Sequence, residues 1–190
     1  AVAGCVTTNK PFSATPDKNK AHDTHLNLGL TYLQRDNREA SRRHFQKALA
    51  IKPNSPSALN GLALLYQLTG EITLAEQTFQ RSLKSDAGFT EARVNYGRFL
   101  YEQKRYAEAY PLFAEGVKDL TFKKRALVLT YLGQTALELG NAVKAKSSFE
   151  HAVNLNNRLA LPMIELGDLY FSQKEYAKSK QYLDKYNALA

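Results

Sequence analysis

A repeat of about 34 residues runs through most of this 190-residue chain. Small residues recur at one position of each unit, at Gly29, Ala63, Gly97, Gly133 and Gly167, with spacings of 34, 34, 36 and 34 residues. Large apolar residues recur in the same way at Phe45, Phe79, Phe113, Phe149 and Leu183. Because a unit of this length cannot bury its apolar face alone, we expect the units to stack and to share a continuous core.

Each unit is predicted to form two helices. In the first unit, Leu26, Leu30 and Leu33 recur at helical spacing. The stretch RDNRE then interrupts the pattern, and a second helix runs to KPN, where Pro53 disfavours continuation. The small residue of each unit is expected to let the two helices approach, and the phenylalanine to fill the space beside it. Later units are predicted to break at Gly70–Glu71, Lys104–Arg105, Gly140–Asn141 and Lys174–Glu175.

The repeat resembles the tetratricopeptide repeat, whose pattern is W-x2-L-G-x2-Y, then A-x3-F, then P. HLNLGLTY, SRRHF and KP match it in the first unit, with His25 in the tryptophan position, and LNGLALLY and AEQTF match it in the second. The resemblance implies an all-α, right-handed α-solenoid of about five repeats. These repeats are expected near residues 22–55, 56–89, 90–125, 126–159 and 160–190, after a tether formed by residues 1–21.

Two features depart from an even array. The third unit is longer by two residues, around VKDLTFKKRA, so we expect the array to bend or loosen there. The fifth unit ends at DKYNALA without a polar capping helix. Since solenoids usually need capped ends, we expect the natural chain to continue further.

Composition and motifs argue against several functional classes. The formal net charge is +8, yet the basic residues are scattered and form no stripe with interleaved aromatics, which argues against nucleic-acid binding. The single cysteine, Cys5, excludes an internal disulfide and a zinc site with several thiolates. No apolar run approaches the ~20 residues that a membrane-spanning helix needs.

No catalytic motif is present: the sequence contains no phosphate-binding loop, no G-x-S-x-G and no His-Glu-x-x-His. His22 and His25 lie three residues apart on one predicted helix, but two imidazoles without a further ligand make a weak metal site. The alternative is that His25 packs in the tryptophan position while His22 is solvated. We predict a protein that is not an enzyme and holds no cofactor and no metal.

In tetratricopeptide arrays the first helices of successive units line a concave groove. The resemblance places the following residues there: Leu26, Leu30, Leu33, Asn60, Leu64, Gln67, Val94, Arg98, Tyr101, Thr130, Gln134, Leu137, Ile164, Asp168 and Phe171. Partner binding is assigned to Leu26, Leu30, Leu33, Leu64, Asn95, Arg98 and Tyr101. The leucines favour an apolar or amphipathic partner segment. Alternatively, two or three of them pack against a neighbouring unit.

Near the start of the chain, Val2-Ala3-Gly4-Cys5 resembles a bacterial lipobox. The resemblance implies that Cys5 is acylated, and Val6, in place of aspartate, implies transport to the outer membrane. TTNKPFSATPDKNK then has the polar composition of a flexible linker. The alternative is an unmodified thiol in a flexible tail.

The third unit contains NYGRFLYEQKRYAEAYPLF, residues 95–113. Together with the lipobox and the repeats, this stretch resembles the PilF/PilW family of type IV pilus biogenesis lipoproteins, which is described with six repeats. The resemblance implies a pilotin: an outer-membrane, lipid-anchored adaptor on the periplasmic face that supports localisation and multimerisation of the type IV pilus secretin. The alternatives are a lipoprotein scaffold of another cell-envelope assembly machine, a peptidoglycan-binding or enzyme-accessory protein, and a cytosolic chaperone adaptor.

Overall fold

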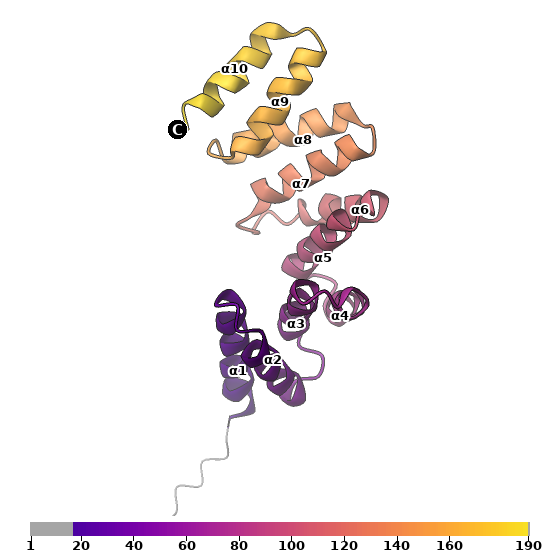
Figure 1. The fold of residues 1–190 in the computed structure, drawn as a ribbon, viewed down its shortest axis with the longest axis vertical. Helices are drawn as coiled ribbons and strands as arrows, with labels where there is room; N and C mark the ends of the chain where they lie inside the picture. Colours follow the sequence, from indigo (N-terminus) through magenta and orange to yellow (C-terminus); the bar gives the residue numbers. More distant parts are fainter. Residues whose placement is uncertain (1–16, 190) are drawn as a thin grey trace, which may run out of the picture.

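The computed structural model describes residues 17–189, and this part of the chain forms ten α-helices and no strand (Figure 1). The helices are α1 (Lys18–Gln34), α2 (Arg38–Ile51), α3 (Pro56–Leu68), α4 (Ile72–Ser85), α5 (Thr90–Glu102), α6 (Tyr106–Gly116), α7 (Arg125–Glu138), α8 (Ala142–Leu155), α9 (Ala160–Ser172) and α10 (Tyr176–Asn187). Consecutive helices pack in pairs, and the pairs stack into a curved array. The predicted all-α solenoid is therefore confirmed.

The contacts between repeats explain which side of the array is concave. The first helix of each repeat touches the first helix of the next, from α1–α3 through to α7–α9. Within residues 17–189, no second helix touches the second helix of the following repeat. The first helices are therefore closer together than the second helices, so they lie on the inner side of the curve. None of the described helices is both long and apolar enough to span a bilayer.

Helix ends follow local capping signals. Asp17 Oδ1 accepts hydrogen bonds from the backbone N–H groups of Asn19 at 2.9 Å and Lys20 at 3.3 Å. This cap satisfies N–H groups that the first turn leaves unpaired. Helix α1 consequently begins at Lys18, four residues before the boundary at residue 22 that the repeat spacing suggests.

The turn inside each repeat has the same backbone conformation. Asp36, Gly70, Lys104, Gly140 and Lys174 all have positive φ, between 54° and 78°. They occupy one repeat position, with spacings of 34, 34, 36 and 34 residues. This left-handed conformation ends the first helix of each pair, and it costs ~1–2 kcal/mol at the residues that are not glycine. The breaks predicted in the second to fifth units are confirmed.

The small-residue and phenylalanine series meet in the core. A Cβ added to Gly29 would lie 2.6 Å from the Phe45 ring, and one added to Gly133 would lie 2.5 Å from Phe149 Cε1. The predicted contact between the two series is therefore confirmed. The Phe45 ring also meets Gly61 of the next repeat, where a Cβ would lie 2.5 Å from Cε1. Phe45 thus packs against the backbones of two successive first helices.

The long third unit does not loosen the array. Its extra residues lie between α6 and α7, where Arg125 Nε donates a hydrogen bond of 2.8 Å to the carbonyl of Val117. One buried cluster extends from Phe79 of α4 through Phe113 of α6 to Val128 of α7. The expectation of a looser contact is wrong, because the added residues form a turn outside the continuous core.

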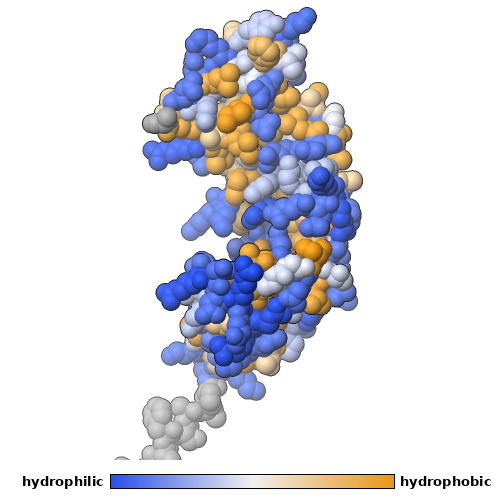
Figure 2. Space-filling model, viewed as in Figure 1, coloured by the Kyte–Doolittle hydropathy of each residue, from blue (hydrophilic) through white to orange (hydrophobic). Residues whose placement is uncertain are grey.

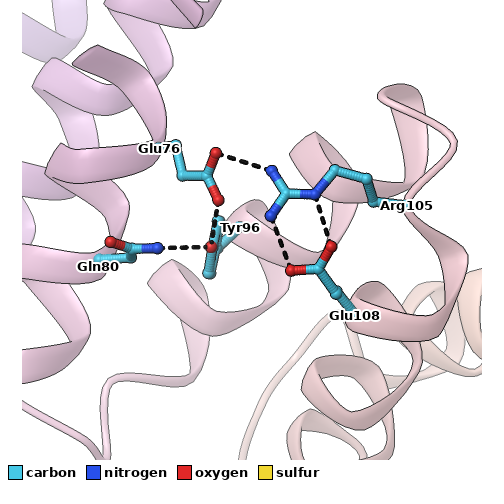
Figure 3. A network of polar contacts seen from close by, with 5 residues as sticks. All are labelled: Glu76, Gln80, Tyr96, Arg105 and Glu108. Carbon is cyan, nitrogen blue, oxygen red and sulfur yellow. Dashed lines mark hydrogen bonds and ion pairs between the residues drawn. The ribbon is translucent and has the colours of Figure 1, made fainter. Parts of the chain in front are cut away.

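A polar network joins the second and third repeats (Figure 3). Arg105 donates hydrogen bonds of 2.7 Å to Glu76 of α4 and to Glu108 of α6. Tyr96 of α5 donates to Glu76 at 3.0 Å and accepts a hydrogen bond from Gln80 at 3.1 Å. The hydrogen bond from Arg105 holds the pKa of Glu76 below its usual value. The network therefore links a second helix to both helices of the following repeat.

The preceding junction uses the same two repeat positions with the charges exchanged. Arg42 of α2 donates to Glu71, which precedes α4. Arg42 stands 34 residues before Glu76, and Glu71 stands 34 residues before Arg105. Equivalent positions thus carry opposite charges in successive junctions, so each junction is electrostatically matched to its own neighbour.

Candidate functional site: the inner surface of the array

The inner side of the curve is the candidate binding surface. Figure 2 shows the outline of the molecule hollowed on the left, between the part formed by α1 and the part formed by α9 and α10. In this view hydrophobic residues are more evident over α7–α10 than over the lower end. The inner surface therefore differs in character along the array.

A pocket of about 280 Å³ lies on this inner surface, where the first three repeats meet. It is lined by Leu33 of α1, by Leu64, Gln67 and Leu68 of α3, and by Arg98 of α5. Three consecutive first helices thus contribute to one site. The structure brings together Leu33, Leu64 and Arg98, as the repeat periodicity predicts for groove positions.

Neighbouring groups hold Arg98 at the edge of this pocket. Its guanidinium lies over the Tyr131 ring, 5.5 Å from the ring centroid, and Nη2 is 4.0 Å from Glu102 Oε1. Gln67 Nε2 donates a hydrogen bond of 2.6 Å to the other oxygen of the Glu102 carboxylate. Arg98 Nε is buried and has no hydrogen-bond partner among the described residues. The pocket therefore combines apolar walls with one guanidinium that can donate to a peptide carbonyl or carboxylate.

The other predicted binding residues have different surroundings. Leu26 is half-buried and, like Leu33, packs against the cluster around Phe45, which agrees with the alternative that some leucines serve packing. Leu30 is exposed. Asn95 Nδ2 donates a hydrogen bond of 3.1 Å to Asn60 Oδ1. The predicted lipidation site, Cys5, lies outside the described residues.

Tyr101 of α5 lies further along the inner surface. Its ring centroid is 5.2 Å from that of Tyr106 and 6.5 Å from that of Tyr131. Burial, followed by the nearby carboxylate of Glu138, raises the pKa of its hydroxyl above the usual value. Tyr101 is therefore part of an aromatic group on α5, α6 and α7, beyond the pocket.

Three residues expected to line the groove are buried instead. Asn60, Val94 and Thr130 occupy the same repeat position, and each is buried. At this position the first helix of one repeat faces the first helix of the next, as the hydrogen bond between Asn95 and Asn60 illustrates. The expectation is wrong for these three residues because contact between neighbouring first helices covers them.

The sequence reasoning overlooked Leu68, which lines the pocket and is 47% exposed. It follows Leu64 by four residues, so it lies one helical turn further along the same face. That spacing is the signal that could have identified it.

The two histidines of α1 do not form a joint site. His22 is 4% exposed, with Nδ1 2.8 Å from Asp23 Oδ1, so the expectation that it is solvated is wrong. The turn of residues 52–56 lies beside it. His25 Nδ1 lies 3.0 Å from Nδ1 of His44 on α2. Within residues 17–189, no group of three or more histidine, cysteine or acidic side chains could hold a metal ion.

Comparisons with known proteins place the chain in a family. Family models described as tetratricopeptide repeat match residues 20–87, 69–121 and 163–190. The type IV pilus assembly protein PilF of Pseudomonas aeruginosa is 36% identical over 185 residues, which cover 96% of this chain and 73% of that protein.

Solved structures agree. The structure of Pseudomonas aeruginosa PilF aligns with a TM-score of 0.87 at 36% identity, over 91% of this chain and 78% of that one. The crystal structure of PilW, described as a widely conserved type IV pilus biogenesis factor, aligns with a TM-score of 0.79 over 90% of this chain and 78% of that one. Its identity of 19% bears on the fold alone. With this sequence identity over nearly its whole length, the chain belongs to the family of tetratricopeptide-repeat proteins that includes the type IV pilus assembly protein PilF.

Proposed function

We propose that this protein is a non-enzymatic adaptor of type IV pilus assembly that binds a segment of the pilus secretin and supports localisation and multimerisation of that pore. The observation that carries the proposal is the 36% identity with PilF over 96% of the chain. Tetratricopeptide repeats are a non-catalytic family that binds proteins, which supports an adaptor role.

The proposed mechanism is non-covalent. The pocket lined by Leu33, Leu64 and Leu68 receives an apolar side chain of the partner, since these leucines offer apolar surface from two helices. Arg98 donates to a carbonyl or carboxylate of the same segment, because its guanidinium already lies at the pocket edge. Apolar contact supplies affinity, and the guanidinium fixes the direction of the segment.

We further propose that acylated Cys5 anchors the protein to the periplasmic face of the outer membrane. The lipobox-like Val2-Ala3-Gly4-Cys5 supports this proposal. Each buried methylene of an acyl chain contributes ~0.8 kcal/mol, so two or three chains give a stable anchor. A tether between the anchor and the repeats would raise the local concentration of the pocket near the secretin.

Cys5→Ser, made in the gene with its natural leader, is expected to release the protein from the outer-membrane fraction and to reduce assembled secretin. The reason is that serine removes the thiol that the acyl chain modifies. Membrane fractionation and gel analysis of secretin multimers measure both effects, with Thr8→Ser as the control in the same tail. Unchanged secretin multimers in the Cys5→Ser strain would contradict the proposed anchor-dependent function.

Leu68→Asp is expected to weaken capture of the secretin by about tenfold or more, because a carboxylate in an apolar pocket loses its hydration. The matched control is Leu74→Asp on α4 of the same repeat, since Leu74 is 43% exposed and Leu68 is 47% exposed. Pull-down of purified secretin, with thermal unfolding of both variants, makes the measurement. Equal capture by the two variants would show that the pocket does not bind the secretin.

A further inference from the structure

Beyond the pocket, the inner surface becomes aromatic and acidic. We define the aromatic-acidic surface as Tyr101, Tyr106, Tyr131, Glu138, Glu165, Asp168 and Phe171, which come from α5, α6, α7 and α9. The Tyr101 ring lies 5.2 Å from Tyr106 and 6.5 Å from Tyr131, so three tyrosines form one group. Phe171 occupies the repeat position of Tyr101, two repeats later, and is 63% exposed. An exposed aromatic side chain of this kind is typical of a binding surface.

The carboxylates of this surface lack cationic partners. No ion pair within residues 17–189 includes Glu138, Glu165 or Asp168. Glu165 is half-buried, and burial, followed by the charges of Asp168 and Glu138, raises the pKa of its carboxyl group. Like charges therefore gather on facing helices with no cation between them, in a chain that has 26 lysines and arginines against 18 acidic residues.

The chain itself shows which group such a surface can hold. The guanidinium of Arg98 lies 5.5 Å from the centroid of Tyr131 and 4.0 Å from Glu102. An aromatic face and a carboxylate thus already bind one cation on the inner surface, between α5 and α7. One repeat further along, tyrosines and carboxylates recur without a cation. A cationic side chain there would stack on an aromatic face and pair with a carboxylate.

We propose that the aromatic-acidic surface binds a basic segment of the partner, with lysine or arginine side chains that pair with Glu165 and Asp168 and lie against the tyrosines. This second contact is distinct from the apolar pocket on α1, α3 and α5. The inference rests on the proposed function for the identity of the partner, but its chemistry rests on the charges and aromatic residues described above. Charge complementarity selects the occupant, because an acidic segment would meet only like charge here.

The test uses the full chain and a fluorescent decapeptide of alternating lysine and alanine, with alternating glutamate and alanine as the reference peptide. Fluorescence anisotropy at low ionic strength measures binding. The net charge of +8 repels a basic peptide from most of the surface, so binding of the lysine peptide reports an acidic site. We expect the lysine peptide to bind and the glutamate peptide not to bind to this surface.

The double variant Glu165→Gln/Asp168→Asn is expected to lose affinity for the lysine peptide by about tenfold, since it removes both pairing charges. The matched control is Glu39→Gln/Asp86→Asn, which makes the same charge change outside the aromatic-acidic surface, and its affinity is expected to change by less than about twofold. Equal losses in both variants, or no binding of the lysine peptide to the natural chain, would overturn the proposal.

Leu68→Asp separates this inference from the proposed function. It should leave affinity for the lysine peptide undiminished, because Leu68 lines the other site. Reduced affinity in Leu68→Asp would place the peptide in the apolar pocket and overturn the inference. If the natural chain binds the lysine peptide as expected but does not capture the secretin, the proposed partner is wrong and the basic-segment site stands.

Discussion

Phe113→Ala is expected to destabilise the array by ~3–5 kcal/mol, the range typical of a phenylalanine deleted from a core. Phe113 is fully buried in the cluster that joins α4, α5, α6 and α7. Its ring stacks on Tyr131, with centroids 5.5 Å apart and planes inclined by 13°. On another side the backbone of Gly97 leaves so little room that a Cβ there would lie 2.9 Å from Phe113 Cε1. Because backbone forms part of this wall, the cavity cannot close by rotation of side chains.

Urea unfolding followed by far-UV circular dichroism measures this effect as a lower midpoint at unchanged slope. The matched control is Phe171→Ala, because Phe171 is 63% exposed and contacts Tyr176 edge-on at 5.4 Å. We expect the control to cost less than ~1.5 kcal/mol, the upper value for such an aromatic pair. If Phe113→Ala cost no more than Phe171→Ala, the cluster would not be the continuous core described above.

Gly133→Val is expected to destabilise the chain by ~3 kcal/mol, at the upper end of the usual cost of overpacking a core. A Cβ at Gly133 would lie 2.5 Å from Cε1, 2.7 Å from Cδ1 and 2.8 Å from Cζ of Phe149. Valine has better helix propensity than glycine, which would add up to ~0.5 kcal/mol of stability on an exposed helix. The clash outweighs that gain because the Phe149 ring is fully buried and has no free space into which it can move.

Thermal and urea unfolding compare Gly133→Val with Gly88→Ala. Gly88 is exposed, and its added Cβ would meet only the carboxylate oxygen of Asp86, at 3.2 Å. This control is expected to change the free energy of unfolding by less than ~0.5 kcal/mol. A Gly133→Val protein as stable as the natural chain would mean that α7 and α8 are further apart than described.

Much of the fold could be predicted because periodicity reports it directly. Gly29 and Phe45 stand at fixed places in a repeated unit, so their contact could be inferred without coordinates. The breaks near Gly70 and Gly140 followed from residues that adopt positive φ readily. Gly61 could not be assigned in this way. Its contact with Phe45 depends on the angle between two repeats, and that angle leaves no periodic trace in the sequence.

The binding surface could be predicted only in part. Periodicity placed Leu33, Leu64 and Arg98 on one side of the array, and the structure brings these three residues into one pocket. The same periodicity placed Asn60 there too, although the neighbouring first helix covers it. Exposure depends on how closely adjacent repeats approach, which a pattern within one helix does not encode.

The sequence by itself determined the helix pairs, their number and the residues of the core, because each unit repeats one local solution to burying an apolar face. Tertiary structure decided which inner positions stay accessible and which charges come together. Glu138 and Glu165 are 27 residues apart in the chain, yet the packing of α7 and α9 brings their charges within reach of each other. Electrostatic interaction depends on distance in space, so only the stacked array could disclose an acidic surface within a basic protein.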